Sequence, residues 1–219
     1  MDYKDTVICT VGASLLTNLN RDKAPDYLKQ LVNAFKEKDH AKVNHLIAAI
    51  QDPLDKSLGA EINSVANIVK KGLLSSRQQM YLLVSDTPEG EQIGEILKGY
   101  FEKNKNGLDF NSVKIIKIEK LNDKSTFDFK FYGLRNLVRE MARCIKESGN
   151  RCIINATGGY KATVAYSTLL GQALKVPVYY LFERFDEIIE LLQVPVKLDT
   201  ALYKEHSKFF AMLEYKNVV

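Results

Sequence analysis

The sequence predicts an α/β fold: a doubly wound, mostly parallel sheet with a helical insertion after the first strand and an antiparallel hairpin at one edge. Short apolar runs, typical of strands buried on both faces, alternate along the 219 residues with longer segments of helical periodicity. Two such runs lead into glycine turns followed by polar residues, at residues 6–12 and 151–159. A third, at 112–121, alternates apolar and charged residues and therefore predicts a strand near an edge.

The first half of the chain contains two predicted strands separated by helices. TVICTVG, residues 6–12, is a continuous apolar run that ends in glycine and predicts the first strand. Residues 24–74 have apolar side chains at three- and four-residue spacing, which predicts the helical insertion. A second strand is expected at 80–84, followed by a helix that begins at Pro88, since proline is favoured at the first helical position.

The second half repeats the alternation. A long helix is expected at 128–148, and the arginines on one of its faces are predicted to meet solvent. Strands are predicted at 151–155 and 176–183, and an edge hairpin at 185–198 with Pro195 near its turn. The arginines are Arg135, Arg139 and Arg143. We expect residues 1–198 to form the sheet domain and residues 199–219 a helical tail.

Composition indicates a globular protein, because 46% of the residues are hydrophobic and 26% are charged. A net charge of +4 and a pI near 8.8 fit an anionic ligand but are too mild to predict a partner of duplex nucleic acid. The three cysteines are predicted to be reduced core thiols, without the spacing of a metal site. No apolar run is long enough to cross a membrane, so a cytoplasmic location is expected.

The segment NATGGYKA, residues 155–162, is predicted to be a strand-to-helix turn at the centre of the site. Gly158 and Gly159 allow the backbone to turn tightly and approach a ligand, and the free amides of the new helix suit an anion. Lys161 opposes the helix dipole unless a phosphate is bound there. The alternative is a tight connecting loop without a ligand. The turn is neither a Walker loop nor a GxGxxG motif.

Polar residues also follow the first and second predicted strands. Because the carboxyl ends of parallel strands share an edge, the loops after the first and central strands should lie side by side. Some of these polar residues could instead cap helices, with Ser14 and one of Asp86 and Thr87 as the candidates. The polar residues are Ser14, Thr17, Asn18, Ser85, Asp86 and Thr87.

Three segments resemble the CARF domains of CRISPR-associated proteins, most closely the standalone ring nucleases and the amino-terminal halves of Csm6-type effectors. They are ICTVGASLLTN, LVSDTPEG and INATGGYKA, at residues 8–18, 83–90 and 154–162. The resemblance implies a homodimeric, Rossmann-like sensor whose two carboxyl edges form one pocket for a cyclic oligoadenylate, most often cyclic tetra-adenylate. It also implies a type III antiviral defence role.

The resemblance assigns Ser14 and Lys161 to catalysis. Ala13 departs from the family pattern, in which a hydroxyl residue is common at this position. The ligand-binding residues implied are Gly12, Ala13, Leu15, Thr17, Asn18, Ser85, Asp86, Thr87, Asn155, Thr157, Gly158, Gly159 and Tyr160.

The expected activity is metal-independent cleavage of cyclic tetra-adenylate to linear di-adenylate with 2′,3′-cyclic phosphate ends, without a cofactor. The ring's own 2′-OH would attack phosphorus, so the protein must fix the geometry and stabilise charge. Neither loop contains a histidine, which predicts slow turnover. The alternatives are a non-catalytic sensor that regulates a fused or partner effector, a dinucleotide-dependent enzyme, which the first turn disfavours, and a purely structural dimer.

Overall fold

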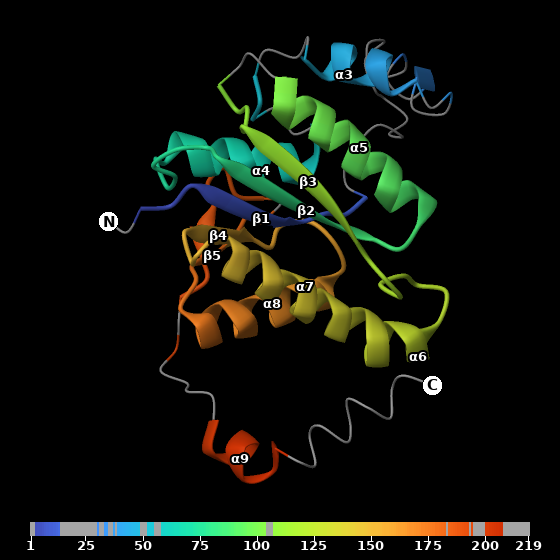
Figure 1. Ribbon diagram of the computed structural model, residues 1–219. Coiled ribbons are helices and arrows are strands. Elements are labelled where there is room, and N and C mark those ends of the chain that lie inside the picture. The colour runs from blue at the N-terminus through green and yellow to red at the C-terminus, as the bar shows by residue number, and fades with distance from the viewer. Residues whose placement is uncertain are drawn as a thin grey trace.

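The computed structural model contains one six-stranded sheet in the order β3-β2-β1-β4-β5-β6 (Figure 1). All neighbouring strands are parallel except β5 and β6, which are antiparallel. The strands are β1 (Thr6–Thr10), β2 (Gln79–Ser85), β3 (Ser112–Ile118), β4 (Cys152–Asn155), β5 (Val178–Tyr180) and β6 (Ile189–Glu190). The structure describes residues 3–13, 30, 33–34, 37, 39–48, 52–54, 58–103, 107–182, 184–192, 194 and 200–207.

Helices cover both faces of the sheet, as expected for a doubly wound fold (Figure 1). One face is covered by α4 (Gly59–Lys70) and α5 (Pro88–Lys103), and α3 (His40–Ala48) packs on α5. The other is covered by α7 (Leu134–Glu147) and α8 (Lys161–Leu174), and α7 continues from α6 (Thr126–Asp128) and a π-helical segment, η2 (Phe129–Gly133). The described part of the tail contains α9 (Thr200–Glu205). The helical insertion after the first strand is therefore confirmed.

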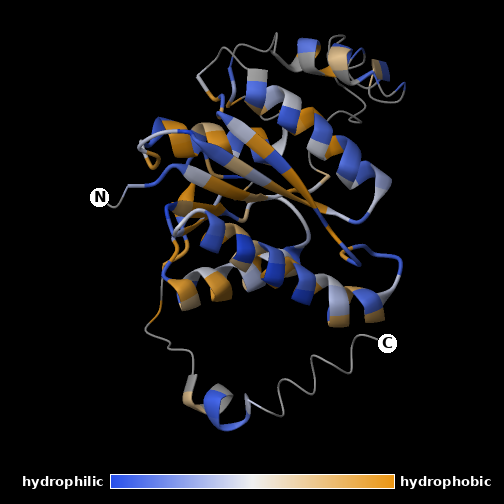
Figure 2. Cartoon of the chain, viewed as in Figure 1, coloured by the Kyte–Doolittle hydropathy of each residue, from blue (hydrophilic) through white to orange (hydrophobic). Residues whose placement is uncertain are grey.

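The central strands β1, β2 and β4 are largely apolar because their side chains alternate between two buried cores. Val7 and Leu82 belong to the core under α4 and α5, whereas Ile8, Tyr81 and Ile154 belong to the core under α7 and α8. Figure 2 shows hydrophobic residues along the strands in the middle of the molecule and many hydrophilic residues on the flanking helices. β3 forms an edge of the sheet, as its alternating sequence predicts.

The predicted antiparallel edge is confirmed. β6 pairs with β5, through Tyr179 opposite Glu190, and the predicted turn near Pro195 lies outside the described residues. Lys71 anchors this connection by an ion pair with Glu187 at 2.9 Å and by donating to the carbonyl of Ile188 at 3.1 Å. These contacts hold the described part of the segment between β5 and β6 against the end of α4.

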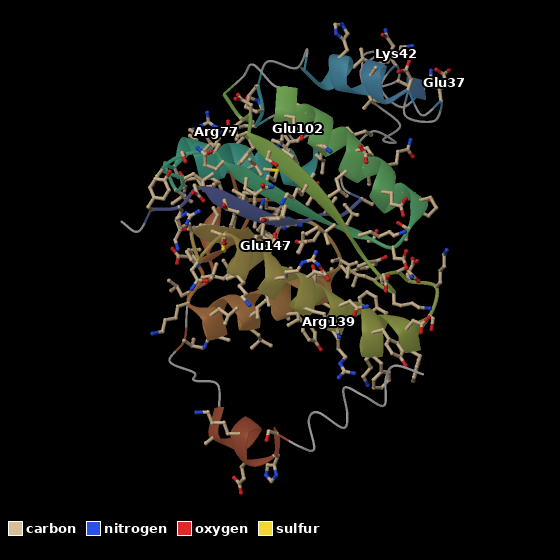
Figure 3. All side chains as sticks on the ribbon, in the orientation of Figure 1. Glu37, Lys42, Arg77, Glu102, Arg139 and Glu147 are labelled. Atoms are coloured by element: carbon tan, nitrogen blue, oxygen red, sulfur yellow. The ribbon has the colours of Figure 1, made fainter. Side chains whose placement is uncertain are left out.

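The predicted long helix is interrupted by the π-helical turn η2. A Cβ on Gly133 would lie 2.5 Å from the carbonyl oxygen of Lys120, so the absence of a side chain lets this turn pack against the preceding loop. Arg135, Arg139 and Arg143 are exposed on this helix, as predicted. Figure 3 shows Arg139 projecting away from the sheet.

The cysteines Cys9, Cys144 and Cys152 are free and buried, as predicted. None of the helices in the described ranges has the length and apolar character needed to cross a bilayer.

Candidate functional site

The candidate site lies at the carboxyl ends of β1 and β4, where the strand order reverses and open α/β sheets bind their ligands. The loops that follow the two strands touch each other. A Cβ added to Gly12 would lie 2.5 Å from the backbone nitrogen of Gly159. The prediction that these loops lie side by side is confirmed for the described residues, which include Gly12 and Ala13.

The glycine turn after β4 packs just as closely on β1. A Cβ on Gly158 would lie 2.5 Å from the carbonyl oxygen of Thr10 and 2.9 Å from the nitrogen of Gly12. The Thr10 hydroxyl donates to the Gly158 carbonyl at 2.6 Å. Gly159 has a φ of +93°, which disfavours any residue with a side chain. Backbone contacts, rather than flexibility alone, therefore require these glycines.

Glu61 of α4 contacts both loops with the same side-chain oxygen. Its side chain is 1% exposed, and its Oε1 accepts a hydrogen bond from the Gly12 amide at 2.7 Å. The same oxygen would collide with a Cβ at Gly158. Glu61 was not among the predicted site residues, although a lone carboxylate among the apolar positions of residues 59–74 is a signal that could have identified it.

Asn155 and Thr157, predicted to bind ligand, hold the loop from within. Asn155 is 1% exposed, and its Nδ2 donates to Ser64 Oγ at 2.7 Å and to Cys9 Sγ at 3.1 Å. The Thr157 hydroxyl donates to Asn155 Oδ1 at 2.6 Å and accepts from the Leu181 amide at 3.1 Å. Neither residue lines the cavity described next, and their geometry is that of supports beneath the turn.

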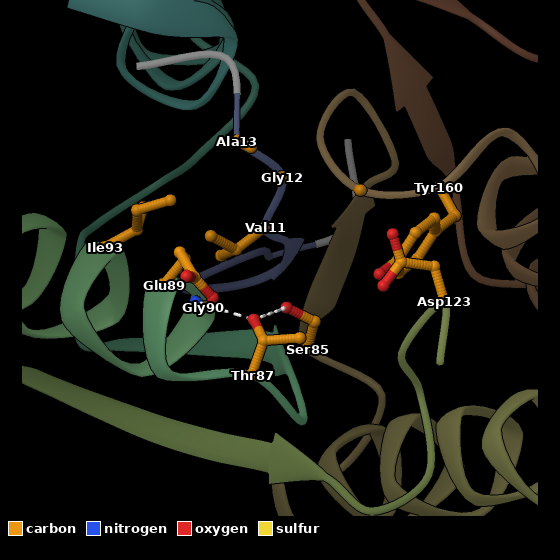
Figure 4. A pocket seen from close by; sticks show the side chains of 11 residues that line it. Val11, Gly12, Ala13, Ser85, Thr87, Glu89, Gly90, Ile93, Asp123 and Tyr160 are labelled. Atoms are coloured by element: carbon orange, nitrogen blue, oxygen red, sulfur yellow. Dashed lines mark hydrogen bonds between the residues drawn. The ribbon is translucent and has the colours of Figure 1, made fainter. Parts of the chain in front are cut away.

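A cavity of about 340 Å³ opens beside the joined loops (Figure 4). Six of the predicted ligand-binding residues line it: Gly12, Ala13, Ser85, Thr87, Gly159 and Tyr160. Five lining residues were not predicted: Val11, Glu89, Gly90, Ile93 and Asp123. Val11 lies at the end of the first predicted strand, and Glu89, Gly90 and Ile93 lie in the helix that follows the second. Asp123 comes from the loop between β3 and α6, where no pattern in the sequence indicates a site residue.

The polar residues after β2 have separate roles. Thr87 caps α5, because its Oγ1 accepts from the Gly90 amide at 3.0 Å, and it also shares a 3.0 Å hydrogen bond with Ser85. Asp86 faces the loop after β3 instead of the cavity, and its Oδ2 accepts from the Lys120 amide at 3.0 Å. The helix-cap alternative is thus confirmed for Thr87.

The start of α8 differs from that of α5. Tyr160 stands at the N-cap without a side-chain capping bond, and the first turn of α8 contains no acidic residue. The first turn of α5, by contrast, has a Thr87 cap and two glutamates, Glu89 and Glu91. Lys161 is exposed at the beginning of α8. The positive end of this helix is therefore open to an anion.

The Tyr160 ring is fixed beside this helix start. It packs edge-on against Phe129 with ring centroids 5.1 Å apart. Burial, and then the nearby negative charge of Asp123, raise the pKa of the Tyr160 hydroxyl above its usual value. The phenol is therefore neutral at physiological pH and keeps its proton for donation.

A family model described as CRISPR-associated protein (Cas_APE2256) matches residues 56–194, which is more than half of the chain. The chain belongs to this family. No curated protein matches the sequence. The matched segment of this CRISPR-associated protein begins just before α4 and includes Glu61, the loop after β2, Asp123 and the glycine turn before α8.

Four site residues predicted for this CRISPR-associated protein, Ser14, Leu15, Thr17 and Asn18, lie outside the described residues. Ala13, which directly precedes Ser14, lines the cavity. Among the residues that the structure describes, no group of three or more His, Cys, Asp or Glu side chains is arranged to hold a metal ion.

Proposed function

We propose that this CRISPR-associated protein is a CARF-type sensor that binds a cyclic oligoadenylate, in particular cyclic tetra-adenylate, and cleaves it to linear di-adenylate. The observation that carries the proposal is the contact between Gly12 and Gly159 at the uncapped start of α8, where Lys161 is exposed. Backbone amides, a helix dipole and an ammonium group there all favour a phosphodiester. The residues 8–18 and 154–162 carry the family resemblance that names the ligand.

Cleavage requires little more than geometry and charge. The ribose 2′-OH attacks the adjacent phosphorus and loses its proton, the bond to the 5′ oxygen breaks, and that oxygen takes up a proton. The products carry a 2′,3′-cyclic phosphate and a free 5′-OH. Lys161 would stabilise charge on the nonbridging oxygens, and Ser14 would hydrogen-bond the attacking hydroxyl or the phosphate to hold the in-line arrangement. This route uses neither a metal nor a cofactor.

We further propose that the protein acts as a homodimer. A closed cyclic ligand with repeated phosphates is most simply bound by two identical sites related by a twofold axis. In such a dimer each protomer supplies one glycine turn and one Lys161 to the ring. Size-exclusion chromatography with light scattering, with and without the ring, measures this; a monomer at both conditions would contradict it.

The test of activity is incubation with cyclic tetra-adenylate in EDTA, with products identified by mass spectrometry. We expect di-adenylate with cyclic phosphate ends. Lys161→Ala should slow cleavage and weaken binding, and Ser14→Ala should reduce cleavage more than binding. Lys146→Ala is the matched control, since it removes the same charge from the last turn of α7. If both site variants cleave at the parent rate, the assigned roles are wrong.

The second candidate is a non-catalytic sensor that regulates a fused or partner effector. The observation that favours it is that neither loop, at residues 11–18 or 155–162, contains a histidine, so neither supplies a side chain that normally titrates near neutral pH. Tight binding of an intact ring, without any di-adenylate after prolonged incubation, would support this function and exclude the ring nuclease.

A further inference from the structure

The cavity beside the glycine loops differs chemically from the start of α8. Val11 and Ile93 supply apolar walls and Tyr160 supplies an aromatic ring, while Glu89 and Asp123 contribute carboxylates (Figure 4). Carboxylates repel a phosphate at close range. The cavity therefore suits an uncharged part of a ligand that has both a flat apolar surface and hydrogen-bond donors.

The α5 side of the cavity does not favour the binding of an anion. The helix start is capped by Thr87 and neutralised by Glu89 and Glu91 in its first turn. Glu91 is also paired with Lys117 at 2.8 Å, so that cation is already engaged. A nucleotide bound across this region would thus keep its phosphate at α8 and place its base in the cavity.

We propose that this cavity is a nucleobase subsite in which Asp123 accepts a hydrogen bond from the exocyclic amino group of adenine while the base lies against Tyr160. The inference rests on the proposed function, because it assigns a place to one base of the cyclic oligoadenylate. Ligand pockets of about 300–1,000 Å³ hold drug-sized molecules, so a cavity of about 340 Å³ has room for a single purine.

Tyr160 is suited to carry the base because its ring is held in place. Phe129 packs against it at an interplanar angle of 80°, and the residue is half-buried. Aromatic side chains that are fixed in this way form stacking platforms for bases. Tyr160 is also the immediate neighbour of Lys161, so a base on the ring and its phosphate on α8 lie within the span of one nucleotide.

In this subsite, Asp123 distinguishes adenine from hypoxanthine. In Figure 4 its carboxylate and the Tyr160 side chain lie together on one side of the cavity, opposite Glu89 and Ile93. The loop that carries it is ordered by Asn122, whose Oδ1 accepts from the Lys124 amide at 3.1 Å and whose side chain is buried. An ionised carboxylate only accepts hydrogen bonds, so it pairs with the amino group of adenine and repels the carbonyl oxygen of hypoxanthine.

The test compares cyclic tetra-adenylate with cyclic tetra-inosinate, whose bases carry an oxygen in place of the amino group. Binding of each ring to the full chain is measured by isothermal titration calorimetry. The parent protein is expected to bind the adenylate ring roughly tenfold to hundredfold more tightly. Asp123→Asn should reduce this ratio to about threefold or less, because the amide can accept from adenine or donate to hypoxanthine.

Two further variants make the test specific. Asp109→Asn removes the same charge from an exposed side chain shortly before β3 and should leave the ratio unchanged. Glu89→Gln should lower the ratio less than Asp123→Asn; the reverse order would overturn the assignment to Asp123. If the parent binds both rings and Asp123→Asn keeps the parent ratio, this inference alone is wrong. If the parent binds neither ring, the proposed function fails together with the subsite.

Discussion

Replacing Gly12 by alanine tests the contact between the two loops without reference to any ligand. The new Cβ would lie 2.5 Å from the Gly159 nitrogen and 3.2 Å from its Cα, and both atoms belong to backbone that cannot rotate away. Ordinary contacts of a Cβ begin near 3.4 Å. The loops must therefore separate by about 1 Å, as expected when a methyl group is forced into a packed interior.

This separation would strain two hydrogen bonds that hold the loops. The Gly12 amide donates to Glu61 at 2.7 Å, and the Thr10 hydroxyl donates to Gly158 at 2.6 Å. Overpacking of this kind costs about 1–3 kcal/mol of stability. Weakening the hydrogen bond to the Glu61 carboxyl oxygen adds to this cost, so we expect Gly12→Ala to lose at least about 2 kcal/mol.

Urea unfolding followed by circular dichroism measures the effect. Gly72→Ala is the control, because a Cβ at Gly72 meets no atom within 4 Å and only the positive φ of +66° opposes it. That strain costs about 1 kcal/mol and should leave the loops in place. If Gly12→Ala unfolds at the parent urea midpoint, the loops do not meet as described, and the reasoning about the site is refuted.

Two further predictions concern Cys9 and Glu61. Burial raises the pKa of the Cys9 thiol from 9.0 to about 12, so at pH 8 roughly one molecule in ten thousand carries the thiolate, and iodoacetamide should label Cys9 only after denaturation. As the pH rises above 9, the thiol of the unfolded chain loses its proton before the buried thiol does. The free energy of unfolding should therefore fall by about 1.4 kcal/mol per pH unit up to pH 12. Labelling of native protein at the denatured rate would contradict both expectations. Glu61→Leu removes the acceptor of the Gly12 amide and should cost about 1–3 kcal/mol, whereas Glu61→Gln keeps an acceptor and should cost less; equal urea midpoints for the two variants would contradict the assigned hydrogen bond.

The fold was predictable because each strand carries its own signal. Strands buried on both faces need continuous apolar runs, and β3, at an edge, needs only an alternating one. The partner of β6 and the π-helical turn η2 were not predictable in this way. Each depends on contacts between distant residues, such as Lys71 with Glu187 and Gly133 with Lys120, which leave no periodicity in the local sequence.

Only those parts of the site that lie at the carboxyl ends of strands were predictable from the sequence. That rule located the meeting of Gly12 with Gly159, because both follow strands of the same parallel sheet. It could not separate the residues that line the cavity from those beneath it, such as Asn155, whose amide donates to Ser64. It also missed Asp123, which comes from a loop after an edge strand.

The central claim is that the glycine loops after β1 and β4 hold a phosphodiester of a cyclic oligoadenylate at the start of α8. A crystal structure with cyclic tetra-adenylate, soaked into crystals of Ser14→Ala to slow its cleavage, tests this most directly. We expect a phosphate within hydrogen-bond distance of the Lys161 ammonium and of the backbone amides at 159–161. Density for the ring on another surface, or crystals that take up no ring at saturating concentration, would contradict it.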